Sequence, residues 1–376
     1  MIKFNEPVAT STLPNIKNLD HYSSGGPYSE KCQQWLIKEL KCQEALLTHS
    51  CTAALEMCAL LLNIKDGDEI IMPSYTFVST ANAFVLRGGK PVFVDIDLNT
   101  CNIDPSKIKQ AISKKTKAIV VVHYAGVSCD MDSILKIAKQ HKLYVIEDAA
   151  QAILSTYKRK PVGSIGDLST ISFHETKNIH CGEGGALLIN NPKFIKRAKI
   201  IRDKGTNRDL FNQNMVKKYT WVDYGSSYGL SEINAAFLYG QLKLAKKITR
   251  KRLATFNYYH NLLENLEIKK LIKRLTIPTY AEANGHMYYI LVKNNKRDKL
   301  VKHLRQKKIN TVFHYTPLHS SPFGKLKATT KSTMLNTNMI SNALLRLPMH
   351  SKLQNKEVMN ICIAISNFLN NKIKNE

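Results

Sequence analysis

The sequence predicts an α/β protein: a large domain with a mostly parallel sheet between helices, followed by a smaller C-terminal α+β domain. Two observations support this. Between residues 40 and 195, short apolar runs alternate with helical stretches, and after about residue 245 the alternation stops. Parallel strands need long crossover connections, usually helices, so the alternation predicts a sheet covered on both faces. We therefore expect residues 1–245 to form the large domain and residues 246–376 the small one.

The expected strands of the large domain are short runs rich in Val, Ile and Leu, bounded by polar turns. They are Glu69–Met72, Pro91–Val94, Ala118–Val122, Leu143–Ile146, Ser169–Phe173 and Ala186–Ile189. The helices expected around them are Ala53–Leu62, Ser79–Leu86, Pro105–Ser113 and Met131–His141. For the small domain we expect helices at Leu242–Asn265, Lys299–Lys307 and Asn355–Leu369, and strands at Met287–Val292 and Thr311–Tyr315.

The composition narrows the function classes. The net charge of +26 invites a nucleic-acid hypothesis, but the basic residues are scattered and no recognition motif accompanies them. The charge also suits an anionic substrate such as a nucleotide sugar. None of the eight cysteines forms a CxxC pair, so we expect reduced thiols and no metal site. No apolar run approaches the roughly 20 residues of a membrane span, and we expect a cytoplasmic protein without a membrane partner.

Polar residues follow two of the expected strands, where ligands gather in parallel sheets. Asp148 and Gln151 come after the strand at 143–146, and Lys177 comes after the strand at 169–173, 29 residues beyond Asp148. A turn of small residues at 48–54 opens the first helix, and such a turn suits a phosphate because free N–H groups and the helix dipole favour an anion. Each feature alone has an ordinary explanation, such as a helix cap or a solvated lysine.

Together these features fit pyridoxal 5'-phosphate. This cofactor needs a lysine for its Schiff base, a carboxylate on its pyridine nitrogen and a cradle for its phosphate. We expect Lys177 to be the lysine and Asp148 to be the carboxylate that keeps the ring nitrogen protonated. Lys177 would then shuttle a proton as a neutral amine, which requires a lowered pKa.

The sequence resembles the DegT-type sugar aminotransferases, which are fold-type I pyridoxal-phosphate enzymes. The run at 172–178 is most similar to one branch, the dTDP-4-amino-4,6-dideoxygalactose transaminases (WecE). The resemblance covers nearly the whole chain, with supporting runs at 73–82, 122–126, 202–208, 225–228 and 314–319. The stretch at 20–28 is a few residues shorter than the glycine-rich loop expected from that branch, and this bears on the identity of the sugar.

The resemblance implies roles for matched positions. Lys177 takes the Schiff-base lysine, Asp148 contacts the pyridine nitrogen, Gln151 lies near the ring hydroxyl and Phe77 stacks on the ring. The positions matched to phosphate binding are Cys51, Thr52, Ser172 and Ser227. Ser227 would reach the phosphate of a second subunit, which implies a homodimer with shared active sites. Those matched to the sugar pocket are His314, Tyr315 and His319, whereas His174 is expected to be a buried scaffold residue.

The implied reaction is transfer of the amino group of L-glutamate to the 4-keto carbon of dTDP-4-keto-6-deoxy-D-glucose. The product, dTDP-4-amino-4,6-dideoxy-D-galactose, would serve bacterial surface polysaccharides such as lipopolysaccharide O-antigen or enterobacterial common antigen. Transfer to a 3-keto sugar, or with the opposite stereochemistry at C4, is the nearest alternative. Two alternatives from other classes remain: a basic nucleic-acid-binding protein, and a nicotinamide dehydrogenase, for which residues 50–54 lack the GxGxxG pattern.

Overall fold

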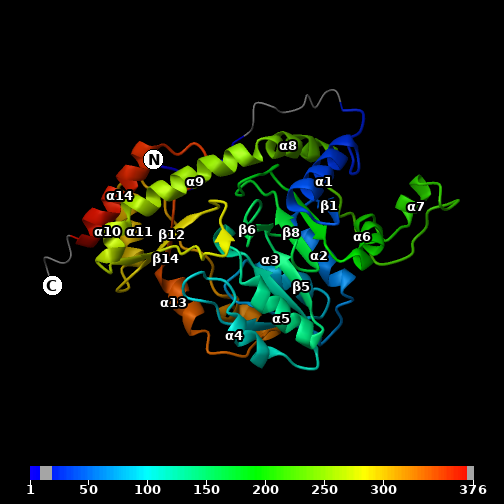
Figure 1. Ribbon diagram of the computed structural model, residues 1–376, viewed down its shortest axis with the longest axis horizontal. Coiled ribbons are helices and arrows are strands. Elements are labelled where there is room, and N and C mark those ends of the chain that lie inside the picture. The colour runs from blue at the N-terminus through cyan, green and yellow to red at the C-terminus, as the bar shows by residue number, and fades with distance from the viewer. Residues whose placement is uncertain (9–18, 371–376) are drawn as a thin grey trace.

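The centre of the protein is an eight-stranded sheet, seen in a computed structural model that describes residues 1–8 and 19–370 (Figure 1). The strand order is β1-β9-β8-β5-β4-β2-β3-β13. The strands are β1 Glu44–Thr48, β2 Glu69–Pro73, β3 Lys90–Val94, β4 Thr116–Val122, β5 Tyr144–Asp148, β8 Leu168–Ser172, β9 Gly185–Ile189 and β13 Thr329–Thr330. Only the pairs that include β9 are antiparallel, so the predicted α/β fold with a mostly parallel sheet is confirmed.

Helices cover both faces of this sheet because successive side chains of a strand point to opposite sides. Ala118 and Val120 of β4 pack on the same side as α2 (Cys51–Leu61), α3 (Val78–Val85) and α6 (Ile195–Arg202). Ile119 and Val121, between them in sequence, pack with α4 (Pro105–Ile108) and α5 (Met131–His141). Two further helices, α1 (Pro27–Leu40) and α8 (Glu232–Lys243), cover the end of the sheet formed by β1 and β9.

A second, three-stranded antiparallel sheet organises the C-terminal part, in the order β10-β12-β14. Its strands are β10 Ile272–Arg274, β12 Tyr288–Val292 and β14 Leu344–Leu347. The long helix α9 (Ala245–Leu262) runs on from α8 toward this sheet (Figure 1). The other helices of this part are α10 Glu264–Ile268, α11 Arg297–Gln306, α12 Pro322–Lys327, α13 Leu335–Ala343 and α14 Asn355–Asn370. The remaining short elements are α7 Arg208–Asn212, β6 Thr156–Tyr157, β7 Lys160–Pro161 and β11 Ala281–Glu282.

The two parts are joined by more than α9. Strand β13, from the C-terminal part, pairs in parallel with β3 at the edge of the large sheet. Tyr75 and Tyr124 of the N-terminal part belong to the same buried cluster as Tyr259 and Ile361 of the C-terminal part. The division near residue 245 stays a prediction, and it coincides with the start of α9.

Two of the expected elements were wrong. Thr311–Tyr315 is not a strand: Val312 makes only an isolated bridge to Arg346, and Tyr315 has a left-handed φ of 46° that ends any extended run. The strands beside β12 are β10 and β14, neither of which is among the expected strands. The expected helix 242–265 is broken at Leu244, where α8 ends and α9 begins.

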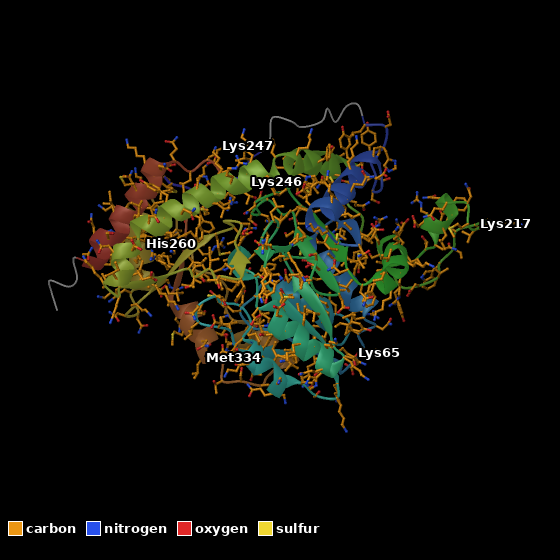
Figure 2. The ribbon with its side chains drawn as sticks, in the orientation of Figure 1. Lys65, Lys217, Lys246, Lys247, His260 and Met334 are labelled. Atoms are coloured by element: carbon orange, nitrogen blue, oxygen red, sulfur yellow. The ribbon has the colours of Figure 1, made fainter. Side chains whose placement is uncertain are left out.

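The basic side chains are dispersed over the surface. Figure 2 shows Lys65, Lys217 and the pair Lys246 and Lys247 on widely separated parts of the molecule. This agrees with the scatter seen in the sequence. No helix within residues 1–8 and 19–370 is long and apolar enough to cross a membrane.

Candidate active site

A cavity of about 420 Å³ opens where β4, β5 and β8 end and α2 begins. It brings together nine of the predicted site residues, which come from distant parts of the chain. They are Cys51, Thr52, Phe77, Asp148, Gln151, Ser172, Lys177, His314 and Tyr315. The position agrees with the rule that ligands bind at the carboxyl ends of parallel strands.

Lys177 supplies a partly buried amine to this cavity. It lies in the turn after β8, where its backbone N–H donates to the carbonyl of His174 at 2.9 Å. Burial lowers the pKa of Lys177, against the opposing influence of Cys51 and Asp148, and the Arg346 charge acts in the same direction as burial. A lowered pKa increases the fraction of neutral amine, which is the form that acts as nucleophile or base.

Asp148 places a buried carboxylate at the end of β5. Its Oδ2 accepts from the Thr80 hydroxyl at 2.7 Å, and its Oδ1 accepts from the N–H of Ala150 at 3.2 Å. Burial raises the pKa of Asp148, although the hydrogen bonds from Thr80 and Ala150 and the charge of Lys177 oppose the shift. A carboxylate accepts about four hydrogen bonds, so these two donors leave capacity for a cationic donor from a ligand.

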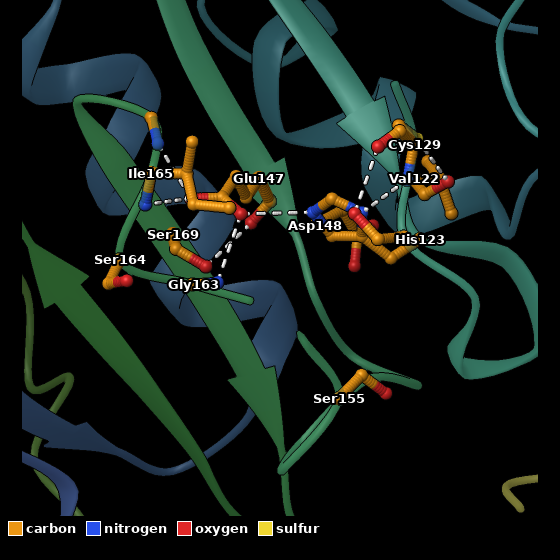
Figure 3. A network of polar contacts seen from close by, with 12 residues as sticks. Val122, His123, Cys129, Glu147, Asp148, Ser155, Gly163, Ser164, Ile165 and Ser169 are labelled. Atoms are coloured by element: carbon orange, nitrogen blue, oxygen red, sulfur yellow. Dashed lines mark hydrogen bonds and ion pairs between the residues drawn. The ribbon is translucent and has the colours of Figure 1, made fainter. Parts of the chain in front are cut away.

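Glu147 precedes Asp148 on β5, so its side chain points to the opposite face of the sheet. There its carboxylate accepts from several donors (Figure 3). It accepts from the N–H groups of Gly163, Ile165 and Gly166 at 2.7–2.9 Å and pairs with His123 Nε2 at 3.0 Å. Burial alone would raise the pKa of Glu147, but these hydrogen bonds and the pairing with His123 lower it. This pair is not among the residues that the sequence predicts. Its only signal was a charged residue inside a strand that is otherwise buried.

The start of α2 forms an anion cradle. Ser50 caps the helix by accepting from the N–H of Ala53 at 3.1 Å, which leaves the N–H groups of Cys51 and Thr52 for a ligand. At Gly185, a Cβ would collide with the backbone nitrogen of Cys51, so only glycine lets β9 approach the helix start so closely. The Ser172 hydroxyl lines the same cavity. Helix N–H groups, the helix dipole and hydroxyl donors suit a phosphate.

One wall of the cavity suits a planar ring. The Phe77 side chain is 56% exposed, although the residue lies between the inner strand β2 and helix α3. The Tyr315 ring lies 6.3 Å from it. Gln151 fixes Tyr315 by donating to its hydroxyl at 2.9 Å, and its own Oε1 accepts from the N–H of Ala125 at 2.7 Å. A flat ligand can therefore rest on an exposed aromatic face with Gln151 at its edge.

His319 and His174 lie differently from what was expected, whereas the role of Ser227 at a second subunit stays a prediction. His319 does not line the cavity, because its Nδ1 lies 2.7 Å from the hydroxyl of Ser74. Ser227 lies outside it too, on an exposed segment that pairs with Asp203. The expectation for His174 was wrong: its side chain is 40% exposed and lies at the cavity beside Thr176 and Glu183.

His314 and Tyr315 both reach the cavity. Their rings stack at 3.6 Å, and the Tyr124 hydroxyl lies 2.6 Å from His314 Nδ1. Burial lowers the pKa of His314 well below its ordinary value, and the charges of Arg346 and Lys177 act in the same direction. The residues on this wall that sequence reasoning missed are Phe4, Arg252, His286 and Arg346.

Nearly the whole chain matches one protein family. Residues 8–366 match the DegT/DnrJ/EryC1/StrS aminotransferase family. The chain belongs to this family. The sugar-aminotransferase resemblance is thereby confirmed at the level of the family, whereas the particular branch is not.

Relatives across the family support the assignment. The spore coat polysaccharide biosynthesis protein SpsC of Bacillus subtilis is 32% identical over 355 residues, covering 92% of this chain and 90% of that protein. The UDP-4-amino-4-deoxy-L-arabinose–oxoglutarate aminotransferase of Shewanella sediminis is 31% identical over 360 residues, covering 92% of each. The solved structure of Helicobacter pylori PseC, an aminotransferase involved in the biosynthesis of pseudoaminic acid, aligns with a TM-score of 0.88 at 26% identity, covering 98% of this chain and 99% of that one.

Aminotransferases of this family use pyridoxal phosphate, and the cavity fits that group. Asp148 is a buried carboxylate with unused acceptor capacity, and Lys177 is a partly buried amine in the same cavity. The cradle at Cys51 and Thr52 suits the phosphate, and the exposed face of Phe77 suits the ring. Within residues 1–8 and 19–370, no group of three or more His, Cys, Asp or Glu side chains could hold a metal ion.

Proposed function

We propose that this sugar aminotransferase uses pyridoxal 5'-phosphate to transfer the amino group of L-glutamate to the 4-keto carbon of a nucleotide sugar. The favoured acceptor is dTDP-4-keto-6-deoxy-D-glucose, which would give dTDP-4-amino-4,6-dideoxy-D-galactose. The observation that carries the proposal is that Lys177 and Asp148 line one cavity, with the pKa of the lysine lowered and that of the carboxyl raised. Perturbed titratable groups in a cleft are typical of active sites.

The residues of the chain divide the chemical work. The bound cofactor supplies an electron sink for the carbon that loses its proton. Asp148 would hold a proton on the ring nitrogen, and the low polarity that raises its own pKa also strengthens that charge-assisted bond. Lys177, once free, would take the proton from the substrate carbon as a neutral amine and return it at the adjacent position. Phe77 and the start of α2 would hold the ring and the phosphate in place while this happens.

Support for the substrate comes from relatives. The Shewanella sediminis relative is named for a 4-amino sugar nucleotide and for oxoglutarate, the keto acid that glutamate leaves behind. The Bacillus subtilis relative is named for polysaccharide biosynthesis. The run at 172–178 favours the dTDP-4-amino-4,6-dideoxygalactose branch and hence a role in surface polysaccharides. A 3-keto acceptor, or the opposite stereochemistry at C4, is the alternative.

We also propose a cytoplasmic homodimer with shared active sites. Ser227, assigned to a partner's phosphate, lies in an exposed segment outside the cavity of its own chain. Nearby aromatic side chains are largely exposed, with Trp221 at 78% and Tyr224 at 61%. A second copy of the chain would cover these surfaces. Sedimentation velocity would test the dimer.

A two-step half-reaction tests the function. The protein is loaded with pyridoxal phosphate, converted with L-glutamate, freed of amino acid and then given keto-sugar nucleotides one at a time. We expect the visible absorbance of the bound cofactor to disappear with glutamate and to return with dTDP-4-keto-6-deoxyglucose, but not with its 3-keto isomer. A return with only the 3-keto isomer would move the assignment to the alternative acceptor. No visible absorbance after loading would contradict the cofactor and the reaction together.

A further inference from the structure

The first turn of helix α3 contacts the carboxyl group of Asp148 through two buried hydroxyl groups in series. The Thr80 hydroxyl donates to Asp148 Oδ2 at 2.7 Å, and its oxygen lies 2.8 Å from the hydroxyl oxygen of Thr76. All three residues are buried, and all three line the active-site cavity. An ionised carboxylate only accepts hydrogen bonds, so Thr80 must direct its proton to Asp148 and Thr76 must donate to Thr80.

Asp148 depends on this hydroxyl because it has few other donors. Within residues 1–8 and 19–370, its other hydrogen bond comes from the N–H of Ala150, which reaches Oδ1 at 3.2 Å. Glu147, by contrast, accepts from three backbone N–H groups whose positions are set by the main chain. The shorter bond to Asp148 comes from a side chain of another element, and bonds to an ionised group are the strong ones. The position of Oδ2 therefore depends on Thr80.

The backbone at the start of α3 brings three parts of the cavity together. Phe77 is the N-cap of the helix, and the N–H of Thr80 donates to its carbonyl at 3.2 Å, while Thr76 comes just before it. Ser79 lies beside Thr80, and its hydroxyl oxygen is 2.7 Å from that of Thr52 in the anion cradle. One helical turn thus contacts the carboxylate and the cradle and also carries the aromatic wall of the cavity.

We propose that Thr80, supported by Thr76, is a positioning residue that holds Asp148 in the orientation in which it binds the ring nitrogen of the cofactor; this inference rests on the proposed function. A carboxyl side chain rotates about single bonds, and a second fixed donor restricts which oxygen can face a ligand. The bond from Thr80 uses one acceptor position of Asp148 and leaves others open to the cavity. Hydrogen bonds in series strengthen one another where polarity is low, so Thr76 makes Thr80 a better donor.

The first test measures the coupling between Thr80 and the charge of Asp148 in the full-length apoprotein. Urea unfolding is compared for the wild type, Thr80→Val, Asp148→Asn and the double variant. Valine resembles threonine in shape but has no hydroxyl, so it leaves the buried carboxylate with one donor fewer. We expect Asp148→Asn to stabilise the Thr80→Val protein more than it stabilises the wild type, by about tenfold in the equilibrium constant of unfolding at neutral pH.

This coupling should depend on pH with a defined sign. The hydrogen bond from Thr80 favours the charged form of Asp148 and opposes the rise in its pKa that burial causes. The coupling should therefore be present near neutral pH and shrink as the pH falls and Asp148 becomes protonated. The other ionisable groups near Asp148 are the same in all four proteins, so their contributions cancel in the comparison. Within the described residues these groups are Lys177, His123, Cys51, Cys58 and Tyr315.

The second test uses the loaded enzyme. Thr80→Val should lower kcat by about 10- to 100-fold, as expected for loss of a hydrogen bond to a charged group, with KM for the keto-sugar nucleotide changed by less than about threefold. Thr80→Ser keeps the hydroxyl, so its kcat should stay within about threefold of the wild type. Thr76→Val removes only the outer hydroxyl, and its loss of kcat should be smaller than that of Thr80→Val.

The matched control is Thr337→Val. Thr337 is also a buried threonine whose hydroxyl donates at 2.7 Å to a buried carboxyl group, that of Asp95, but neither residue lines the active-site cavity. This variant should lose stability, keep its kcat and show no coupling with Asp148→Asn. Thermal unfolding of every variant checks that it folds. If Thr80→Val does not fold, Thr80→Ala and Thr76→Val decide the question by the same comparison.

The proposal and the function can fail separately. Additive effects of Thr80→Val and Asp148→Asn at neutral pH would overturn the proposal, because Thr80 would then act through packing alone. A loss of kcat in Thr80→Ser as large as that in Thr80→Val would also overturn it. If the loaded protein shows no visible absorbance, the proposed function is wrong. The apoprotein comparison still decides in that case whether Thr80 holds Asp148, because it requires no cofactor.

Discussion

Glu147 and Asp148 are adjacent buried carboxyl groups on one strand, yet their surroundings shift their pKa values in opposite directions. On one face of the sheet, Glu147 receives three backbone N–H groups and the His123 imidazole, and its pKa is lowered. On the other face, Asp148 receives one hydroxyl and one N–H group, and burial raises its pKa. The difference lies in the number of donors, since both side chains are shielded from solvent.

This comparison separates a carboxylate that stabilises the fold from one that is kept available for a ligand. The donors to Glu147 come from the loop at 163–166 and from His123 after β4, so its charge ties β5 to two neighbouring segments. The acceptor capacity that Asp148 retains opens into the cavity that holds Lys177. Stability should therefore depend on Glu147 and activity on Asp148.

The largest expected effect comes from the amine of Lys177, which lines the same cavity as Asp148. Lys177→Ala should reduce transaminase turnover by at least about 10⁴-fold, because both the covalent attachment and the proton transfer depend on this amine. The loaded protein should also lose its wild-type visible absorbance spectrum, while thermal unfolding shows an intact fold. An unchanged spectrum would refute the role of Lys177.

Asp148→Asn should lower kcat by about 10³-fold, because an amide cannot hold the ring nitrogen in its protonated form. Without cofactor, the variant should be at least as stable as the wild type at neutral pH, since a buried carboxylate with a raised pKa opposes folding there. Steady-state kinetics and urea unfolding of the apoprotein measure the two quantities. Activity within a few-fold of wild type would contradict the assignment.

Glu147→Gln should have the opposite effect, with a loss of stability and little loss of activity. Removing the charge from a site with four donors should cost about 2–4 kcal/mol in the free energy of unfolding. Turnover per folded molecule should remain within about tenfold of the wild type, because the side chain lies on the face away from the cavity. A large loss of kcat with unchanged stability would show that the comparison is wrong.

The smallest effect is a difference in pH dependence. The pKa of Glu147 is lowered from its ordinary value of 4.5, so its stabilisation is present above that pH and is lost as pH falls through the lowered value. The pKa of Asp148 is raised from its ordinary value of 3.8, so its penalty is present above the raised value and disappears as pH falls toward 3.8. Urea midpoints of both variants and of the wild type should be measured between pH 3.5 and about pH 7. Near neutral pH the midpoint of Glu147→Gln should lie below that of the wild type, and the midpoint of Asp148→Asn should lie at or above it. Both differences should become smaller as the pH falls.

Much of the cofactor side of the cavity could be predicted from the sequence because its residues follow strands directly. Asp148 and Lys177 stand just beyond apolar runs, and Cys51 and Thr52 open a helix, so local pattern places them at one edge of the sheet. The fold class followed from the same alternation.

The opposite wall could not be predicted in this way. Arg346 interrupts the apolar run of β14, and only tertiary packing decides that its side chain reaches the cavity. His319 matched a family motif, but Ser74 holds it outside the cavity. The run Thr311–Tyr315 has the alternation of a strand, yet the left-handed backbone of Tyr315 turns its ring toward Phe77. The assignment of Ser227 requires a second copy of the chain, which one sequence does not place.

Strand β13 has a consequence for any attempt to shorten the protein. Thr329 and Thr330 pair with Val92 and Phe93 of β3, and Asp95, just beyond β3, accepts from the N–H groups of Asn336 and Thr337 at the start of α13. A chain truncated after α8 would lose these partners and leave β3 as a bare sheet edge, open to aggregation. The N-terminal part, which contains Lys177, therefore depends on the residues of β13, more than 80 positions beyond the end of α8. Limited proteolysis at the surface should release no soluble N-terminal fragment.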